Sequence, residues 1–148
     1  MAVKSEITTA DGSKVTVVRA QEGDSSAQLK QELALTVLDA VVVLAGGAPV
    51  LDPAVKPRLT QLLGRGLLRA LGEFKALCVL RAGDDSIADL LGACARDALH
   101  RPLMLGVAPA GKVGGGEGAM PALAPSLSHL VVAPGAQWGD EGRARIDL

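Results

Sequence analysis

Short apolar runs alternate with longer segments in which apolar residues recur every three or four positions along this chain of 148 residues. Continuous runs of Val, Leu and Ala are typical of parallel strands that are buried on both faces. The runs predict strands over residues 14–20, 40–45, 76–80, 103–107 and 130–133. The longer segments predict helices over residues 25–36, over residues 53–72 and after Asp84 or Asp85.

Polar residues at the start of two predicted helices support these assignments. Ser25 or Ser26 can cap the first helix and Asp84 or Asp85 the third, because their side-chain oxygens accept hydrogen bonds from free backbone N–H groups. The first helix is expected to bury Leu29, Leu33 and Thr36. The expected inner face of the third helix consists of Ile87, Leu90, Leu91, Cys94 and Ala98.

The alternation of strands and helices determines the predicted fold class. Such chains form βαβ units with right-handed crossovers and a mostly parallel sheet. We therefore expect an α/β fold, a three-layer domain with a central and mostly parallel sheet. The length suits a single domain over residues 1–148, because the sequence shows neither internal repeats nor a linker to a second domain.

Composition narrows the class of function. Hydrophobic residues make up 49% of the chain, but Phe74 and Trp138 are its only aromatic residues, so the core must be aliphatic. Single-stranded nucleic acids are usually bound by several stacking aromatic side chains within a basic surface, and the formal charge here is −1. We therefore expect no nucleic-acid partner.

The cysteines and the hydropathy pattern indicate the compartment. Cys78 and Cys94 both lie in apolar series and lack the C-x-x-C spacing of a redox pair, which is typical of reduced thiols in a cytosol. The first residues contain no apolar signal core, and no apolar run reaches the roughly 18 residues of a membrane span. We expect a soluble, cytoplasmic protein without a membrane span.

Four turns that follow predicted strands are candidates for ligand binding. They are Gly46-Gly47, Gly83-Asp84-Asp85-Ser86, Ala108-Pro109-Ala110-Gly111 and Pro134-Gly135. Ligands of open parallel sheets bind beyond the carboxyl ends of the strands, where glycine lets the backbone approach a phosphate closely. Each turn alone is more often a simple connection between a strand and a helix. Their convergence at one edge of the sheet makes a binding site as plausible as a set of simple connections.

Other motifs do not indicate catalysis. The segment from Gly106 to Lys112 fits G-x-x-x-x-G-K, but Val113 occupies the place of the Ser or Thr that binds magnesium, so we do not expect a nucleotide triphosphatase. His100 and His129 are separate in sequence and have simple structural explanations near element ends, and no serine lies in a G-x-S-x-G motif. We expect no metal site and no hydrolase triad.

The segment Trp138-Gly139-Asp140-Glu141 leaves two roles open. Trp138 either closes the core or covers a ligand. Asp140 and Glu141 either accept hydrogen bonds from ribose hydroxyls or cap a helix. The residue types alone do not separate these alternatives.

Three blocks of this sequence resemble the SLOG superfamily, and most closely its LSDAT branch, which is similar to the N-terminal regions of melastatin-type TRP channels. The blocks are Val41-Val42-Val43-Leu44-Ala45-Gly46-Gly47-Ala48, Pro102 to Pro109, and Ser128 to Glu141. The resemblance covers residues 38 to 141, and its last block is the most specific. It implies a Rossmann-like fold and the sensing of nucleotide-derived ligands such as ADP-ribose or NAD-related molecules.

The resemblance, together with the turns, gives the expected set of ligand-binding residues. The set consists of Gly46, Gly47, Ala48, Gly83, Asp84, Asp85, Ser86, Pro109, His129, Gly135, Trp138, Gly139 and Glu141. The family pattern near Gly-Gly-Thr-Asp-Ser-Gly-Val is altered here to Arg81-Ala82-Gly83-Asp84-Asp85-Ser86-Ile87, and Leu127 stands where a second His is usual. The family domain also continues beyond the Trp-Gly-Asp-Glu block, so we expect a form that is shortened at its C-terminus.

We therefore expect a module that binds or senses a nucleotide-derived ligand, with no other cofactor. One alternative is an N-glycosidase that resembles the LOG enzymes and cleaves nucleoside monophosphates, with Asp84, Asp85 or Glu141 as the acidic group. Another alternative is a ligand-free scaffold that binds only protein. We also expect self-association into a homo-oligomer, because an aliphatic chain of this size can leave apolar surface uncovered.

Overall fold

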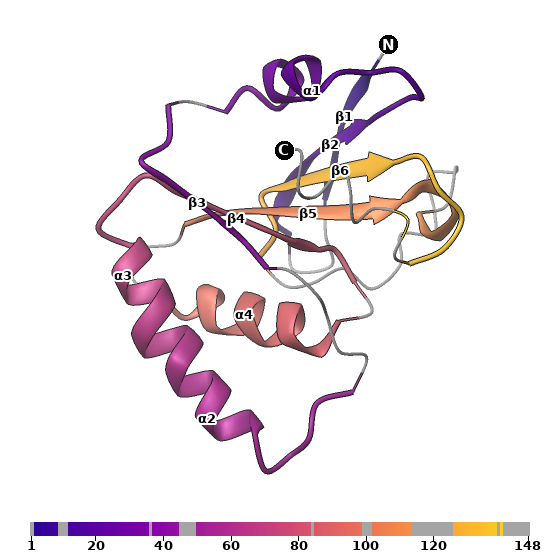
Figure 1. Cartoon of the computed structure of the whole chain (residues 1–148). Coiled ribbons are helices and arrows are strands. Elements are labelled where there is room, and N and C mark those ends of the chain that lie inside the picture. Colours follow the sequence, from indigo (N-terminus) through magenta and orange to yellow (C-terminus); the bar gives the residue numbers. More distant parts are fainter. Residues whose placement is uncertain are drawn as a thin grey trace.

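The computed structural model describes residues 2–8, 12–35, 37–44, 50–83, 85–98, 102–113, 126–138 and 140. Within these residues the chain forms a six-stranded sheet in the order β1-β2-β6-β5-β4-β3 (Figure 1). The strands are β1 (Val3–Thr8), β2 (Lys14–Arg19), β3 (Ala40–Val43), β4 (Ala76–Arg81), β5 (Leu103–Pro109) and β6 (His129–Ala133). β1 pairs antiparallel with β2, and all other neighbouring strands are parallel.

Helices cover both faces of this sheet, which gives three layers (Figure 1). α1 (Ser26–Leu33) lies on one face, where Leu29 and Leu33 join a core cluster with alternate residues of β2, β4, β5 and β6. α2 (Lys56–Thr60), η1 (Gln61–Leu68), α3 (Arg69–Leu71) and α4 (Ser86–Arg96) cover the other face. The predicted α/β fold with a central, mostly parallel sheet is confirmed.

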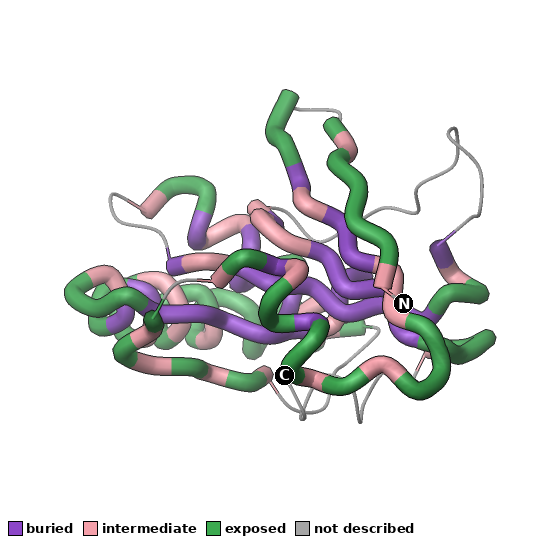
Figure 2. Tube along the Cα trace, turned by 90° about the horizontal axis from the view of Figure 1, so that it is seen from above, coloured by how far each residue is buried: buried purple, intermediate pink, exposed green. Residues whose placement is uncertain are grey.

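The buried strands explain why this sheet forms. Residues 76–80 of β4 are buried without interruption, because the strand has neighbours on both edges and helices near both faces (Figure 2). β1 differs, since its residues are exposed apart from one half-buried position. Its pattern Val3-Lys4-Ser5-Glu6 contains no apolar run, so this strand was not predicted.

Local capping chemistry determines where two helices begin. Ser25 and Gln28 form a reciprocal capping box at the start of α1, and Ala34 ends that helix in the left-handed conformation. Asp85 caps α4 with its side chain, as the sequence predicted for Asp84 or Asp85. The observed helix α1 is shorter than the predicted helix over residues 25–36, because Ala34 terminates it.

The predicted helix over residues 53–72 is continuous from Lys56 to Leu71 but contains a π-helical segment, η1. Gly64 of this segment faces Cys94 of α4, and a Cβ at Gly64 would lie 3.5 Å from the Cys94 sulfur. A Cβ at this distance would be in ordinary van der Waals contact, so the packing of the two helices leaves room for an alanine at Gly64.

The buried face of α4 is rotated relative to the prediction. Ala88, Leu91 and Ala95 lie in the core cluster, whereas Ile87 and Cys94 are only half-buried. Small Ala side chains on the inner face let the helix approach the sheet closely. The prediction chose the inner face from its large apolar side chains and therefore missed these alanines. No helix among the described residues is long and apolar enough to cross a membrane.

Candidate functional site at the carboxyl edge of the sheet

The carboxyl ends of the parallel strands lie side by side. Arg81 ends β4 opposite Val107, and Pro109 ends β5 opposite Ala133, the last residue of β6. The turns that follow these strands therefore begin at one edge of the sheet. Two of the predicted turns are joined directly, because the Gly111 N–H donates a 2.8 Å hydrogen bond to the Gly135 carbonyl.

The connections beyond this edge diverge to opposite faces of the sheet. β2 continues to α1 on one face, whereas the segment after β6 brings Trp138 against the core cluster on the other face. β2 and β6 are neighbours, so the chain leaves this pair of strands toward opposite faces of the sheet. In open α/β sheets ligands usually bind in the crevice beyond the carboxyl ends of the strands.

The loop after β6 is held in shape by a carboxylate. Oδ2 of Asp140 accepts hydrogen bonds from the backbone N–H groups of Ala136 at 2.9 Å and Gln137 at 3.0 Å. The bonds from Gln137 and Ala136 lower the pKa of Asp140 below its usual value, because they favour the charged carboxylate. Of the two roles considered for Asp140, the structure shows backbone capping, here of a loop.

Gly111 and Ala136 approach each other more closely than any side chain would allow. A Cβ at Gly111 would lie 2.5 Å from the carbonyl oxygen and 2.6 Å from the Cα of Ala136. Gly135 has a φ of +144°, and a Cβ there would lie 2.5 Å from Cβ of Asp140. Gly111 is therefore required by the contact between the two turns, and Gly135 by its φ and by the nearby side chain of Asp140.

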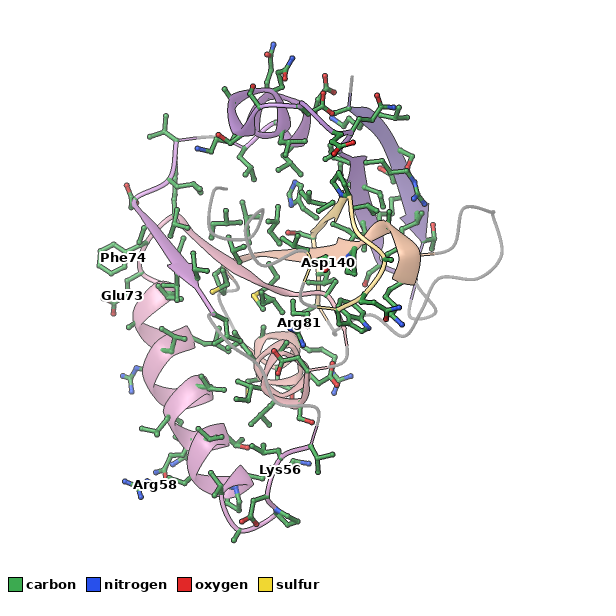
Figure 3. All side chains as sticks on the ribbon, turned by 45° about the vertical axis from the view of Figure 1, so that its right-hand side comes forward. Lys56, Arg58, Glu73, Phe74, Arg81 and Asp140 are labelled. Carbon is green, nitrogen blue, oxygen red and sulfur yellow. The ribbon has the colours of Figure 1, made fainter. Side chains whose placement is uncertain are left out.

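Arg81 and Trp138 bring a cation and an aromatic ring together at this edge. The Arg81 guanidinium carbon lies 5.8 Å from the centre of the Trp138 ring, within the range of a cation–π interaction. Trp138 is half-buried and packs against the core cluster, so it helps to close the core. Figure 3 shows Arg81 between α4 and Asp140, at the predicted ligand edge.

The turn before α4 is occupied by its own carboxylate. Asp85 is 1% exposed, and its Oδ1 accepts hydrogen bonds from the N–H groups of Ile87 at 2.9 Å and Ala88 at 3.4 Å. These are the donors that a helix would otherwise offer to a phosphate. Gly83 is buried in the same turn. The turn is therefore a stable strand-to-helix connection, and a phosphate would have to bind beside it.

A pocket of about 490 Å³ adjoins this turn. It is lined by Val50, Leu51, Lys56, Ser86, Asp89, Leu90 and Ala93. Ser86, Asp89, Leu90 and Ala93 lie on one face of α4. Lys56 lies at the start of α2 (Figure 3). Burial, and next the charge of Asp85, raise the pKa of Asp89 above its usual value. Ser86 belongs to both the predicted turn and the pocket.

Lys56 and Asp89 were not predicted as site residues. Each occupies an ordinary polar position of an amphipathic helix, and 33 residues separate them in the sequence. Only the packing of α4 beside the start of α2 brings them to one pocket. A pattern that is read along one helix at a time contains no signal for such a pair.

His129 lies away from the other predicted site residues. It is the first residue of β6, and parallel pairing places it at the amino edge of the sheet, opposite Thr16 and Leu105. Its Nδ1 lies 2.8 Å from Oγ of Ser128, and burial lowers its pKa. The structure therefore does not bring His129 together with the predicted residues at the carboxyl edge.

Six of the predicted site residues lie outside the described residues: Gly46, Gly47, Ala48, Asp84, Gly139 and Glu141. The G-x-x-x-x-G-K segment is strand β5 as far as Pro109, and Ala110–Lys112 is a single 3-10 turn. This segment is therefore not a phosphate-binding loop. Among the described residues no group of three His, Cys, Asp or Glu side chains could hold a metal ion.

The fold and the edge together define a Rossmann-like α/β domain with a candidate ligand site beyond the carboxyl ends of its parallel strands. Comparison with family models identifies the domain further. The chain belongs to the family described as "SLOG in TRPM, prokaryote", the LSDAT branch of the SLOG superfamily, whose model matches residues 39–148. The predicted family is thus confirmed. No curated protein matches the chain.

Proposed function

We propose that this protein is a binding or sensing module for a nucleotide-derived ligand such as ADP-ribose or an NAD-related molecule. Membership of a SLOG family supports this class of ligand. The observation that carries the proposal is the position of Arg81 and Trp138 at the carboxyl edge, where the turns after β4, β5 and β6 meet.

Arg81 and Trp138 match the two chemical parts of a nucleotide. A guanidinium binds phosphate oxygens through charge-assisted hydrogen bonds, and an indole face can stack on a base. The carboxylate of Asp85 already satisfies the first N–H groups of α4, so the phosphate must rely on cationic side chains. Arg81 supplies one cation, and Lys112 of the 3-10 turn lies after the neighbouring strand β5.

The pocket beside Ser86 suits the rest of the ligand. Its size falls within the range of about 300–1,000 Å³ that is usual for small-molecule sites. Val50, Leu51, Leu90 and Ala93 offer apolar contact, and the hydroxyl of Ser86 and the carboxyl of Asp89 are suited to ribose hydroxyls. Because Ser86 lies in the turn after β4, we propose that one ligand extends from Arg81 into this pocket.

The environment of Asp85 favours binding over N-glycosidic cleavage. A general acid or base must reach the bond that it acts on. Asp85 is buried and directs Oδ1 at the backbone of its own helix. We therefore propose a binding module and no hydrolytic activity.

Filling the pocket is expected to weaken binding. Ala93→Leu places a larger side chain in the pocket, so the affinity for ADP-ribose should fall by about tenfold or more, equivalent to roughly 1.4 kcal/mol. Ala70→Leu is the matched control, because Ala70 is exposed on α3 and does not line the pocket. Calorimetric titration of both variants with ADP-ribose, NAD and AMP measures the effect. Equal affinity in the two variants would place the ligand outside this pocket.

A further inference from the structure

One face of the helix that runs from α2 through η1 to α3 carries exposed arginines. Its exposed positions recur every three or four residues and include Arg58, Leu62, Arg65 and Arg69, which we call the arginine stripe. The opposite side of the same helix buries Leu68 and Leu71 against the sheet. The stripe therefore lies on the outer surface of the domain.

The charge of this surface has no local counterpart. Residues 53–72 contain one lysine, three arginines and no carboxylate. Asp52 and Glu73 flank the helix in the sequence. Among the described residues, none of the three arginines forms an ion pair with a carboxylate. The whole chain has a formal charge of −1, so the stripe is a concentrated positive surface on a nearly neutral protein.

Exposed apolar side chains accompany these charges. Leu62 is 58% exposed within the stripe, and Phe74 is 56% exposed just beyond the end of α3. In Figure 3, Arg58 and Phe74 lie at opposite ends of this helix and both point away from α4. Arginine is one of the residue types that are enriched in interaction hot spots.

We propose that the arginine stripe docks an acidic, helical segment of a partner protein. Arginine forms planar, bidentate hydrogen bonds with carboxylates, and it is enriched in protein interfaces while lysine is depleted. A membrane surface would select lysine equally well and would need a wider apolar face than Leu62 provides. The use of arginine at all three charged positions therefore favours carboxylates on a protein.

The geometry defines the kind of segment that fits. Arg58 and Arg69 are 11 residues apart, which corresponds to a rise of about 16 Å along a helix. A partner helix of about three turns covers this length and can present Glu at positions three or four residues apart. A Leu or Met between those Glu residues would contact Leu62. The partner is thus an amphipathic helix with acidic residues beside a narrow apolar line.

Fluorescence anisotropy with a synthetic peptide tests this proposal. The probe is a labelled helical peptide of about four turns with Glu at every third or fourth position and one central Leu. The Arg65→Gln/Arg69→Gln double variant should bind it about tenfold or more weakly, because two charge-assisted contacts are lost. The Leu62→Ala variant should bind it several-fold more weakly. Arg96→Gln is the matched control, because Arg96 is exposed on α4.

Further controls decide between the proposal and its alternatives. The same peptide with Gln in place of Glu should not bind, and the affinity for the Glu peptide should fall as salt increases. Equal affinity of the double variant and Arg96→Gln would overturn the proposal. Binding of wild-type protein to vesicles of phosphatidylserine and phosphatidylcholine, without binding to the peptide, would also overturn it and indicate a membrane surface. Nucleotide titration of the double variant should be unchanged, which separates this surface from the ligand site.

Discussion

Replacing Gly111 with alanine should lower the free energy of unfolding by about 1–3 kcal/mol, the usual cost of overpacking a close contact. The new Cβ would lie 2.5 Å from the carbonyl oxygen of Ala136. The clashing atoms belong to the backbone, so a rotamer change cannot relieve the clash. The shift would also strain the hydrogen bond from Gly111 to Gly135, which joins two turns of the candidate site.

Gly66→Ala is the control for this effect, and it should act in the opposite direction. A Cβ at Gly66 would meet nothing within 4 Å, and the residue lies in a helix. Alanine in place of glycine at such a position stabilises by about 0.5–1 kcal/mol. Urea denaturation measures both variants. If Gly111→Ala were as stable as the wild type, the close approach of Gly111 and Ala136 would not exist in solution.

Arg81→Ala should reduce the affinity for ADP-ribose by about tenfold or more. Hydrogen bonds to charged groups contribute about 1.5–3 kcal/mol, and the variant removes the cation that we assign to the phosphate. Arg81→Lys should have an intermediate effect, since it keeps the charge but loses the planar group over Trp138. Calorimetric titration measures the dissociation constants.

Arg96→Ala is the matched control for the Arg81 variants. Arg96 is exposed in the last turn of α4, and its contact with Asp97 at 3.9 Å is on the surface. The control should bind ADP-ribose as the wild type does. Arg81→Ala protein that retains the wild-type affinity, with an unchanged denaturation profile, would show that the phosphate binds elsewhere.

The strands and helices were predictable because their signals are local. Buried strands of a parallel sheet are apolar throughout, and Asp85 and Ser25 cap helices through atoms only a few residues away. β1 was missed because it is a mostly exposed edge strand, whose partner β2 determines its pairing. The rotated face of α4 was missed because Ala88 and Ala95 are buried by close packing and not by size.

The candidate site was predictable only to the extent that topology determines it. Parallel strands bring the turns after Arg81, Pro109 and Ala133 to one edge whatever the side chains are, and the contact of Gly111 with Gly135 follows from this arrangement. His129 is the first residue of its strand and so lies at the opposite edge, a consequence that the resemblance obscured. Lys56 and Asp89 meet through helix packing, for which the sequence has no local signal.

The most direct test of the proposed site is a heteronuclear NMR titration of the protein with ADP-ribose. We expect saturable shifts of the Trp138 indole N–H and of the backbone amides of Gly83, Ser86 and Gly111, which lie at the carboxyl edge or the adjoining pocket. The amides of His129 and Leu130, at the start of β6, should not move. Shifts confined to the amino edge, or no shifts at millimolar ADP-ribose, would contradict the assignment of the carboxyl edge as the ligand site.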